Sequence, residues 1–507
     1  MTAIERLAEW LVALRWEDIP EGVRERARHQ VANVVASMIA GAENDDAASV
    51  RRAVSGWGTA GPCTVIPTGE RLPLAEALLV GGAHSMALDY DDYVAMGHTG
   101  HSAVLVSLAL AEMRGGPLRD PLVAQVAANE IGGRLGASVV LGPQNGQAWS
   151  FLHAVEGAAV AAKLGGLDAR RAAHALAIAL YQPTFTLWPG FMGPGSKVLT
   201  AAPMVDGARA ADFAREGMTG ALDILEAPQK GFWASFAWAP LPARMDGLGE
   251  RWVTDTIAYK KYPGCAYIGT TMDALFAACA EGGLRAADVD KVEVTANLLT
   301  VEMTNLSAPH LRPGAPLSPI HINFSIPYSV AVGLVGGRLG SRELGRSYLD
   351  AHDAEIRALA GRVALAHDWA MTRRTVDAFG GGADLMRLAP RDALRAVFGY
   401  LGMMGGDKEH RVGLAGIWRA RGDGKPAGPI AFPARVVVTA RDGRRFFAER
   451  DVPEGAPGAP RYFETVADKM RIEAEGRLAP GSAERILDLC RRYEDVTAAE
   501  IVAAATA

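Results

Sequence analysis

Residues 84–113 read HSMALDYDDYVAMGHTGHSAVLVSLALAEM and place a dense group of titratable side chains directly before an apolar run. The run from Ala103 to Ala111 carries no charge and is typical of a buried segment. The stretch therefore predicts a polar loop next to a buried helix. The titratable residues of this loop and its flanks are Asp89, Asp91, Asp92, His84, His98 and His101.

Helical periodicity extends through the first half of the chain around this stretch. Apolar residues recur every three or four positions, with Gly, Pro or Asp at the breaks, and the many alanines favour close helix packing. The expected helices are Ile4–Leu14, Glu21–Ile39, Pro73–Leu88, Ala103–Glu112, Leu122–Leu141, Ala154–Leu164 and Ala169–Leu180.

The pattern changes near residue 259, where β-branched residues begin to cluster. DKVEVTANLLTVEM (290–303) and ARVVVTARDGRRFFAERDV (434–452) predict strands, and the Pro-rich segment Asn305–Pro319 predicts a loop. Helices are expected between them at Thr270–Ala280 and Ile326–Val335, and again from Phe463 to the end. We therefore expect a mainly α protein with an inserted α+β lid. The expected divisions are the first part of a helical domain at 1–258, the α+β lid at 259–458, and the C-terminal return to the helical domain at 459–507.

Composition narrows the class of protein. The 507 residues are 49% hydrophobic and 21% charged, which is ordinary for a globular protein. A net charge of −5 gives no electrostatic reason to bind nucleic acid or an anionic membrane. The amphipathic, acid-containing N-terminus does not resemble a signal peptide, so a cytoplasmic location is expected. The four cysteines lack metal-ligand or disulfide spacing.

The Asp/His loop allows three interpretations. It could be a solvated connection between helices, or an acid–base site in which an aspartate orients a histidine. It could also hold a metal ion, since His98 and His101 lie three residues apart beside aspartates.

Three further side chains are candidates for a functional site. Lys197 precedes a helical run, Lys260 lies at the boundary of the lid, and Tyr328 begins an apolar helix. Lysines in a cleft between domains are natural partners for an anionic substrate, although most such residues are only surface or core positions.

The order of several motifs resembles the MmgE/PrpD family over nearly the whole chain. They are ALDYDD…HTGHSAVL, SKVLTAAPMVDGARAA, DILEAPQKGFWASFA, YKKYPGCAYIGTTMDAL and FSIPYSVAVGL. The resemblance implies a helical domain with an inserted lid, a homodimer, and chemistry on a small di- or tricarboxylate without an organic cofactor. It also implies an active site between the domains, with the loop lining its floor.

The resemblance assigns roles to single positions. Asp89 matches the first aspartate of the D-[FY]-D-D motif and His98 the catalytic histidine, with His101 in reserve because the spacing is one residue short. Lys197, Lys260 and Tyr328 match the family's catalytic lysines and tyrosine, and Cys265 falls in a turn where packing is expected.

The chain also departs from the family pattern around the expected substrate site. Tyr93 stands where relatives carry threonine, and Gln147 stands where many carry histidine, with His153 six residues later. LRPGAPLSP replaces an NxPxP stretch, and residues 379–423 are rich in Gly, Met and Arg. Tyr93, Gln147, His153 and His101 are therefore expected to shape substrate binding.

The expected reaction is proton abstraction next to a carboxylate by a histidine that Asp89 orients, with lysines stabilising the enolate-like charge. Dehydration, decarboxylation or epimerisation could follow from that intermediate. Two alternatives stay open: a helical metal-dependent hydrolase using His84, Asp89, His98 and His101, and an inactive binding relative.

Overall fold

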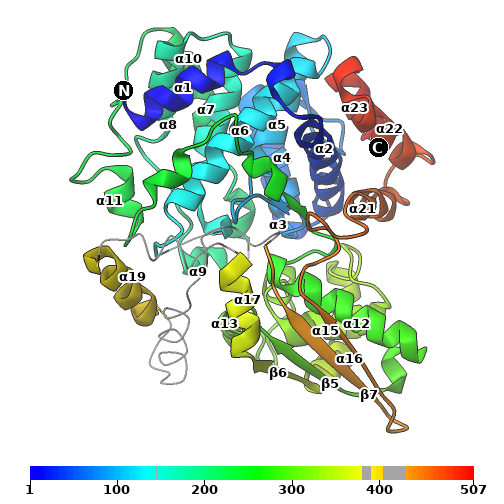
Figure 1. Cartoon of the computed structure of the whole chain (residues 1–507). Coiled ribbons are helices and arrows are strands. Elements are labelled where there is room, and N and C mark those ends of the chain that lie inside the picture. The colour runs from blue at the N-terminus through cyan, green and yellow to red at the C-terminus, as the bar shows by residue number, and fades with distance from the viewer. Residues whose placement is uncertain (144–145, 194, 379–389, 404–429, 507) are drawn as a thin grey trace.

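The computed structural model describes residues 1–143, 146–193, 195–378, 390–403 and 430–506. It is mainly helical, with a smaller α+β part packed at one end of a helical body (Figure 1). This confirms the expected fold class. None of the helices in these ranges is long and apolar enough to cross a lipid bilayer.

The helical body is built from both ends of the chain. Helices from its C-terminal segment lie beside α2 from the N-terminal segment, as the red and blue ribbons of Figure 1 show. Its helices are α1 (Ala3–Ala13), α2 (Glu21–Gly41), α3 (Asp45–Ser55), α4 (Leu74–Met86), α5 (Gly100–Arg114), α6 (Arg119–Ser138), α7 (Phe151–Leu164), α8 (Ala169–Ala179), α9 (Trp188–Phe191), α10 (Met204–Arg215), α11 (Phe232–Phe236), α21 (Glu464–Ala474), α22 (Ser482–Arg491) and α23 (Ala498–Ala504).

Small residues let these helices approach closely, as the sequence predicts. A Cβ atom on Gly207 of α10 would lie 1.9 Å from the carbonyl oxygen of Ala154 in α7. One on Gly157 would lie 2.5 Å from the carbonyl oxygen of Met204. The two backbones therefore touch, and any larger side chain would force α7 and α10 apart.

The α+β part contains a four-stranded sheet in the order β6-β5-β7-β8. β5 pairs parallel to β6 and antiparallel to β7, and β7 forms a hairpin with β8. Its elements are α12 (Gly269–Gly282), β5 (Val289–Ala296), α13 (Leu298–Ser307), α14 (Pro319–Ile322), α15 (Ile326–Gly336), α16 (Arg346–Ala360), β6 (Val363–His367), α17 (Trp369–Ala378), α19 (Pro390–Met403), β7 (Ala434–Ala440) and β8 (Arg445–Arg450).

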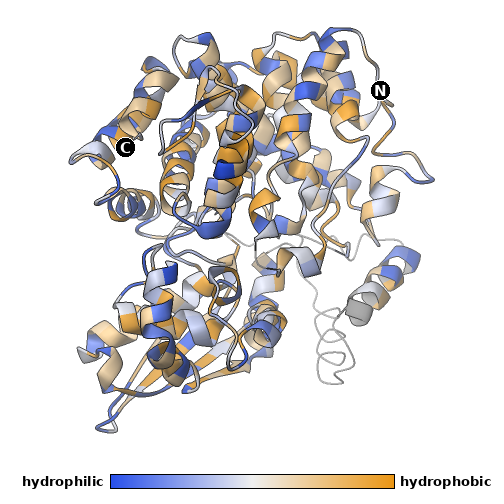
Figure 2. Ribbon diagram, turned by 180° about the vertical axis from the view of Figure 1, so that it is seen from behind, coloured by the Kyte–Doolittle hydropathy of each residue, from blue (hydrophilic) through white to orange (hydrophobic). Residues whose placement is uncertain are grey.

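One face of the sheet packs against helices. Val292 and Val294 of β5 are buried with Val436 of β7 and Met272 of α12, in a core that also includes Ala83 and Leu88 of the helical body. Burial alternates along β7 and along residues 292–296 of β5, because successive side chains point to opposite faces. Figure 2 shows hydrophobic residues both on this sheet and on the helices beside it.

Elements of both parts differ from expectation. Residues 290–303 form β5 and then α13, so the prediction of one long strand is wrong beyond Ala296. The Asn297 side chain accepts from the Thr300 backbone N–H and starts the helix there. β6 and α3 were not predicted, and residues 379–389 and 404–423 of the Gly/Met/Arg-rich region lie outside the described residues.

Candidate active site

A short two-stranded ribbon joins the Asp/His loop to the start of the α+β part. β3 (Asp92–Tyr93) pairs antiparallel with β4 (Ala258–Tyr259). On either side of it, the Lys260 N–H donates to the Asp91 carbonyl at 3.0 Å and the Gly264 N–H to that of Asp89 at 3.1 Å. These backbone bonds place Lys260 directly over the loop that carries the aspartates.

Lys260 bridges the first two aspartates of the loop. Its Nζ atom donates to the carboxylate of Asp89 and, at 2.8 Å, to Oδ1 of Asp91. Burial acts to lower the pKa of Lys260, but the two carboxylates outweigh it and raise that pKa above its ordinary value. Lys260 is therefore a permanent cation in the site.

A second lysine approaches from a short 3₁₀ helix, Ser196–Leu199. Lys197 Nζ lies 3.3 Å from Oδ2 of Asp89 and 5.3 Å from the ring centre of Phe191. Burial acts to raise the pKa of Asp89, but Lys197 and Lys260 lower it overall. The pKa of Lys197 itself is lowered by burial, while Asp89 opposes that shift.

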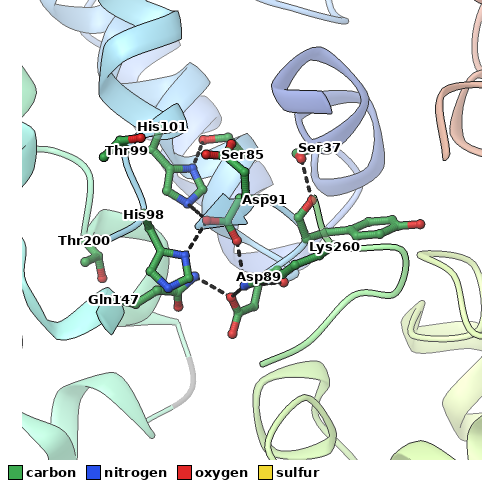
Figure 3. A network of polar contacts seen from close by, with 12 residues as sticks. Ser37, Ser85, Asp89, Asp91, His98, Thr99, His101, Gln147, Thr200 and Lys260 are labelled. Atoms are coloured by element: carbon green, nitrogen blue, oxygen red, sulfur yellow. Dashed lines mark hydrogen bonds and ion pairs between the residues drawn. The ribbon is translucent and has the colours of Figure 1, made fainter. Parts of the chain in front are cut away.

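Asp91, at the centre of Figure 3, contacts two histidines as well as Lys260. Its Oδ2 atom lies 2.5 Å from Nδ1 of His98 and 3.0 Å from Nε2 of His101. Burial acts to raise the pKa of Asp91, but His98 and Lys260 hold that pKa well below its usual range. Asp91 is therefore an ionised acceptor, and each ring nitrogen facing it must carry a proton.

This geometry fixes the tautomer of His98. Burial lowers the pKa of His98, with Asp91 opposing the shift, so the ring is neutral near pH 7. A neutral ring that donates from Nδ1 to Asp91 leaves Nε2 as its acceptor. His98 lines the pocket described below, so this nitrogen can take a proton there. The expectation that Asp89 orients the histidine is corrected: Asp91 does so, and Asp89 instead pairs with the lysines.

The pocket lies between the helical body and the α+β part. Asp89, His98, Gln147 and Lys260 supply polar atoms to its lining, and Tyr93 and Cys265 also line it. A set of six larger side chains, here termed the apolar wall, faces these polar groups. The apolar wall consists of Trp188, Phe191, Tyr267, Met303, Phe324 and Phe432.

Three buried polar atoms at this pocket have no hydrogen-bond partner within the described residues. They are the hydroxyl of Tyr93 and Oε1 of Gln147 in the lining, and Nζ of Lys197, which lies outside the lining and forms only its ion pair with Asp89. The Gln147 amide already donates through Nε2 to Asp89. Burial raises the pKa of Tyr93, so its hydroxyl stays a neutral donor. Unsatisfied buried polar atoms are costly, and a bound polar ligand would satisfy them.

The remaining sequence candidates lie farther from the pocket lining. His101 supports Asp91 and contacts Ser85 Oγ through Nδ1 at 2.9 Å. His153 lies behind it, with Nδ1 at 2.8 Å from Ser102 Oγ. The Tyr328 hydroxyl donates to the Leu311 carbonyl at 3.0 Å and does not line the pocket. Burial raises the pKa of the Cys265 thiol to about 12, which agrees with a packing role.

The four-residue metal set considered from sequence is not assembled, because Nδ1 of His84 contacts the Ile66 carbonyl instead. Asp91, His98 and His101 do offer ligand atoms within 4.8 Å of one another. However, the 2.5 Å contact between Asp91 and His98 is a hydrogen-bond distance, and Lys260 already neutralises Asp91. A cation would have to replace both interactions.

The fold and pocket define a two-part helical protein with a buried acid–base site between its parts. Comparison with known families identifies that class more closely. The MmgE/PrpD N-terminal domain matches residues 5–241 and the MmgE/PrpD C-terminal domain matches residues 262–383. The chain belongs to the MmgE/PrpD family, as the sequence motifs predict.

Two of the curated relatives come from Aspergillus species. A cis-aconitate decarboxylase-like protein of Aspergillus oryzae is 25% identical over 274 residues, which cover 50% of this chain and 57% of the relative. Cis-aconitate decarboxylase of Aspergillus terreus is 26% identical over 288 residues, covering 53% and 58%. The chain thus spans little more than half the length of these relatives.

Proposed function

We propose that the protein is a cofactor-independent lyase or isomerase that removes a proton from the carbon next to a carboxylate. Membership of the MmgE/PrpD family and the relatives named as cis-aconitate decarboxylases support a lyase of the dehydratase or decarboxylase type. The observation that carries the proposal is the Asp91–His98 pair, which leaves a neutral imidazole acceptor at a pocket beside two lysines.

Each polar group has a distinct part in this chemistry. Nε2 of His98 accepts the proton while Asp91 stabilises the imidazolium that forms. Lys197, with free N–H donors, binds the substrate carboxylate and stabilises the negative charge that develops on it. Lys260 holds Asp89 and Asp91 in place and adds positive charge. Loss of water, loss of CO2 or reprotonation could each complete the reaction.

Deuterium exchange tests this proposal directly. Chelator-treated protein is incubated in D2O with cis-aconitate, citrate, succinate and the monocarboxylate 3-phenylpropanoate, and proton spectra are followed with time. The expected result is deuterium at the carbon next to a carboxylate, or a changing alkene signal, with wild-type but not with His98→Ala. Exchange that appears only after a divalent metal is added would favour the hydrolase alternative. Carboxylate binding without any exchange would favour an inactive relative.

We also propose, from the family resemblance, that the protein is a cytoplasmic homodimer. Light scattering after size exclusion should then give twice the chain mass of 53.5 kDa. A mass that stays at one chain over micromolar concentrations would contradict the dimer.

A further inference from the structure

The positive charges at the pocket are balanced by nearby carboxylates, and much of the pocket lining is apolar. Asp89, which lines the pocket, and Asp91, which contacts the lining residues His98 and Lys260, are both ionised, and each has an ammonium group beside it, from Lys197 or Lys260. These four charges sum to zero, and His98 is neutral because burial lowers its pKa. No arginine is among the described residues that line the pocket.

Only one of the two lysines has donors left for a ligand. Lys260 Nζ is occupied by the Asp89 and Asp91 side chains and by the Asp89 carbonyl at 3.1 Å. Lys197 Nζ lies 3.3 Å from Oδ2 of Asp89 and has no hydrogen-bond partner beyond this ion pair within the described residues, so N–H donors remain on it; the residue is 3% exposed. One carboxylate can therefore be bound by a buried ammonium group. Any further carboxylate would lose its water without gaining a counter-ion.

The ammonium group of Lys197 lies close to two aromatic rings of the pocket. Lys197 Nζ lies 5.3 Å from the ring centre of Phe191 and 5.2 Å from that of Phe324, both members of the apolar wall. Trp188 and Tyr267 also belong to this wall. A ligand whose carboxylate reaches Lys197 must lay its remaining atoms against this surface.

We propose that the substrate is a monocarboxylate with an aryl or branched alkyl group, rather than a small di- or tricarboxylate. This inference rests on the proton-abstraction function proposed above and sharpens it. The single carboxylate pairs with Lys197, and the apolar group is buried against the apolar wall. Aromatic and aliphatic surface removed from water then supplies the binding free energy that further ion pairs would supply to a tricarboxylate.

Equilibrium binding separates this proposal from the reaction itself. The probes are 3-phenylpropanoate, propanoate and cis-aconitate, titrated calorimetrically into the full-length protein at constant ionic strength. We expect 3-phenylpropanoate to bind at least tenfold more tightly than either of the other two. Equal or tighter binding of cis-aconitate would overturn the proposal, as would the absence of measurable 3-phenylpropanoate binding.

Variants test where the apolar group is held. Trp188→Ala should weaken 3-phenylpropanoate binding about tenfold and leave propanoate binding unchanged. Trp57→Ala is the matched control, because Trp57 is 58% exposed and does not line the pocket. Lys197→Met should abolish binding of both monocarboxylates. Equal loss of both ligands in Trp188→Ala would contradict a dedicated apolar subsite.

The binding and exchange results can fail independently. A preference for 3-phenylpropanoate without deuterium exchange on any acid would support the ligand class and contradict the proposed reaction. Exchange on cis-aconitate, with tighter binding of cis-aconitate, would support the reaction and overturn the ligand class.

Discussion

The loop Asp89–Tyr93 carries aspartates on two faces, and the carboxyl groups on the two faces have opposite shifts in pKa. On the front face, Asp89 lines the pocket and pairs with lysines, and Asp91 pairs with the lining residues His98 and Lys260. On the back face, Asp92 points into the helical body and accepts from the Gln30 amide at 2.8 Å. All three carboxyl groups are at most 1% exposed.

The partners decide the charge of each carboxyl group. Cationic neighbours lower the pKa of Asp89 and Asp91 despite burial. Burial raises the pKa of Asp92 to about 6, with the nearby Asp91 adding to the shift, because neutral amides compensate much less. The two carboxyl groups of the front face therefore ionise below their ordinary pKa, whereas the one on the back face ionises only near pH 6 and then lacks a cationic partner as close as those of the front face.

The front face should lose most when its base is removed. His98→Ala deletes the only proposed proton acceptor, and we expect kcat/KM to fall by about 10³-fold, within the range for a general base. The unfolding midpoint should change little, since the ring borders the pocket. Initial rates and thermal unfolding of both proteins measure these quantities. Retention of wild-type kcat/KM would exclude His98 as the base.

The second front-face change removes the charge that orients the base. Asp91→Asn should lower kcat by about 10²-fold, because the amide can no longer fix the Nδ1–H tautomer of His98. Asp91 also raises the pKa of His98 against burial, so that pKa should fall in the variant. The acidic limb of the pH–rate profile should therefore move to lower pH. A limb that moves to higher pH would contradict this assignment.

A buried lysine supports the loop from the back face. Lys469 of α21 donates to the Tyr90 carbonyl and, at 2.9 Å, to Oδ1 of Asn33. Because Tyr90 lies between the two front-face aspartates, Lys469→Met should shift them and lower kcat about tenfold, with a smaller change in KM. Steady-state kinetics of the variant give the separate changes in kcat and KM. An unchanged kcat would show that Ser37, which also donates to Tyr90, is enough.

Lys469 also predicts a dependence of stability on pH. Burial lowers its pKa from 10.5 to about 7 in the folded protein, so the unfolded chain binds more protons between these values. Wild-type stability should therefore gain from this residue as pH rises from about 7 to about 10. Lys469→Met should lack that gain in denaturant unfolding. A difference between the two proteins that is constant with pH would contradict the lowered pKa.

The front face was largely predictable from sequence, since the motifs that resemble the MmgE/PrpD family assigned Asp89, His98, Lys197 and Lys260 to one site. The partner of His98 was not predictable, because a loop has no fixed side-chain period. Asp89 has a φ of 52°, a left-handed conformation that redirects its side chain and that no residue pattern signals here.

The back face was not predictable because its contacts are remote. Lys469 and Tyr90 are 379 positions apart, and nothing in the local pattern of α21 distinguishes this lysine from a surface one. Tyr328 shows the converse limit. Its motif predicted a place in the site, but its helix turns the hydroxyl toward Leu311.

The smallest effect on activity is expected when the aspartate of the back face, Asp92, is replaced by asparagine. Asp92→Asn should keep the hydrogen bond from Gln30, because an amide oxygen accepts as a carboxylate does. We expect kcat/KM to stay within about threefold of wild-type, against about 10²-fold for Asp91→Asn one residue away. A loss as large as that of Asp91→Asn would break the distinction between the two faces.

The ionisation of Asp92 should instead affect the free energy of unfolding. Its pKa of about 6 in the folded protein exceeds the ordinary 3.8, so the folded state binds more protons between these values. Wild-type stability should therefore fall as pH rises from about 4 to about 6, and Asp92→Asn, a neutral isostere, should not share that loss. At pH 7.5 the variant should be more stable by up to about 3 kcal/mol. Equal stability of the two proteins from pH 4 to 7.5 would mean that Asp92 is ionised without penalty, and that both faces of the loop carry full charge.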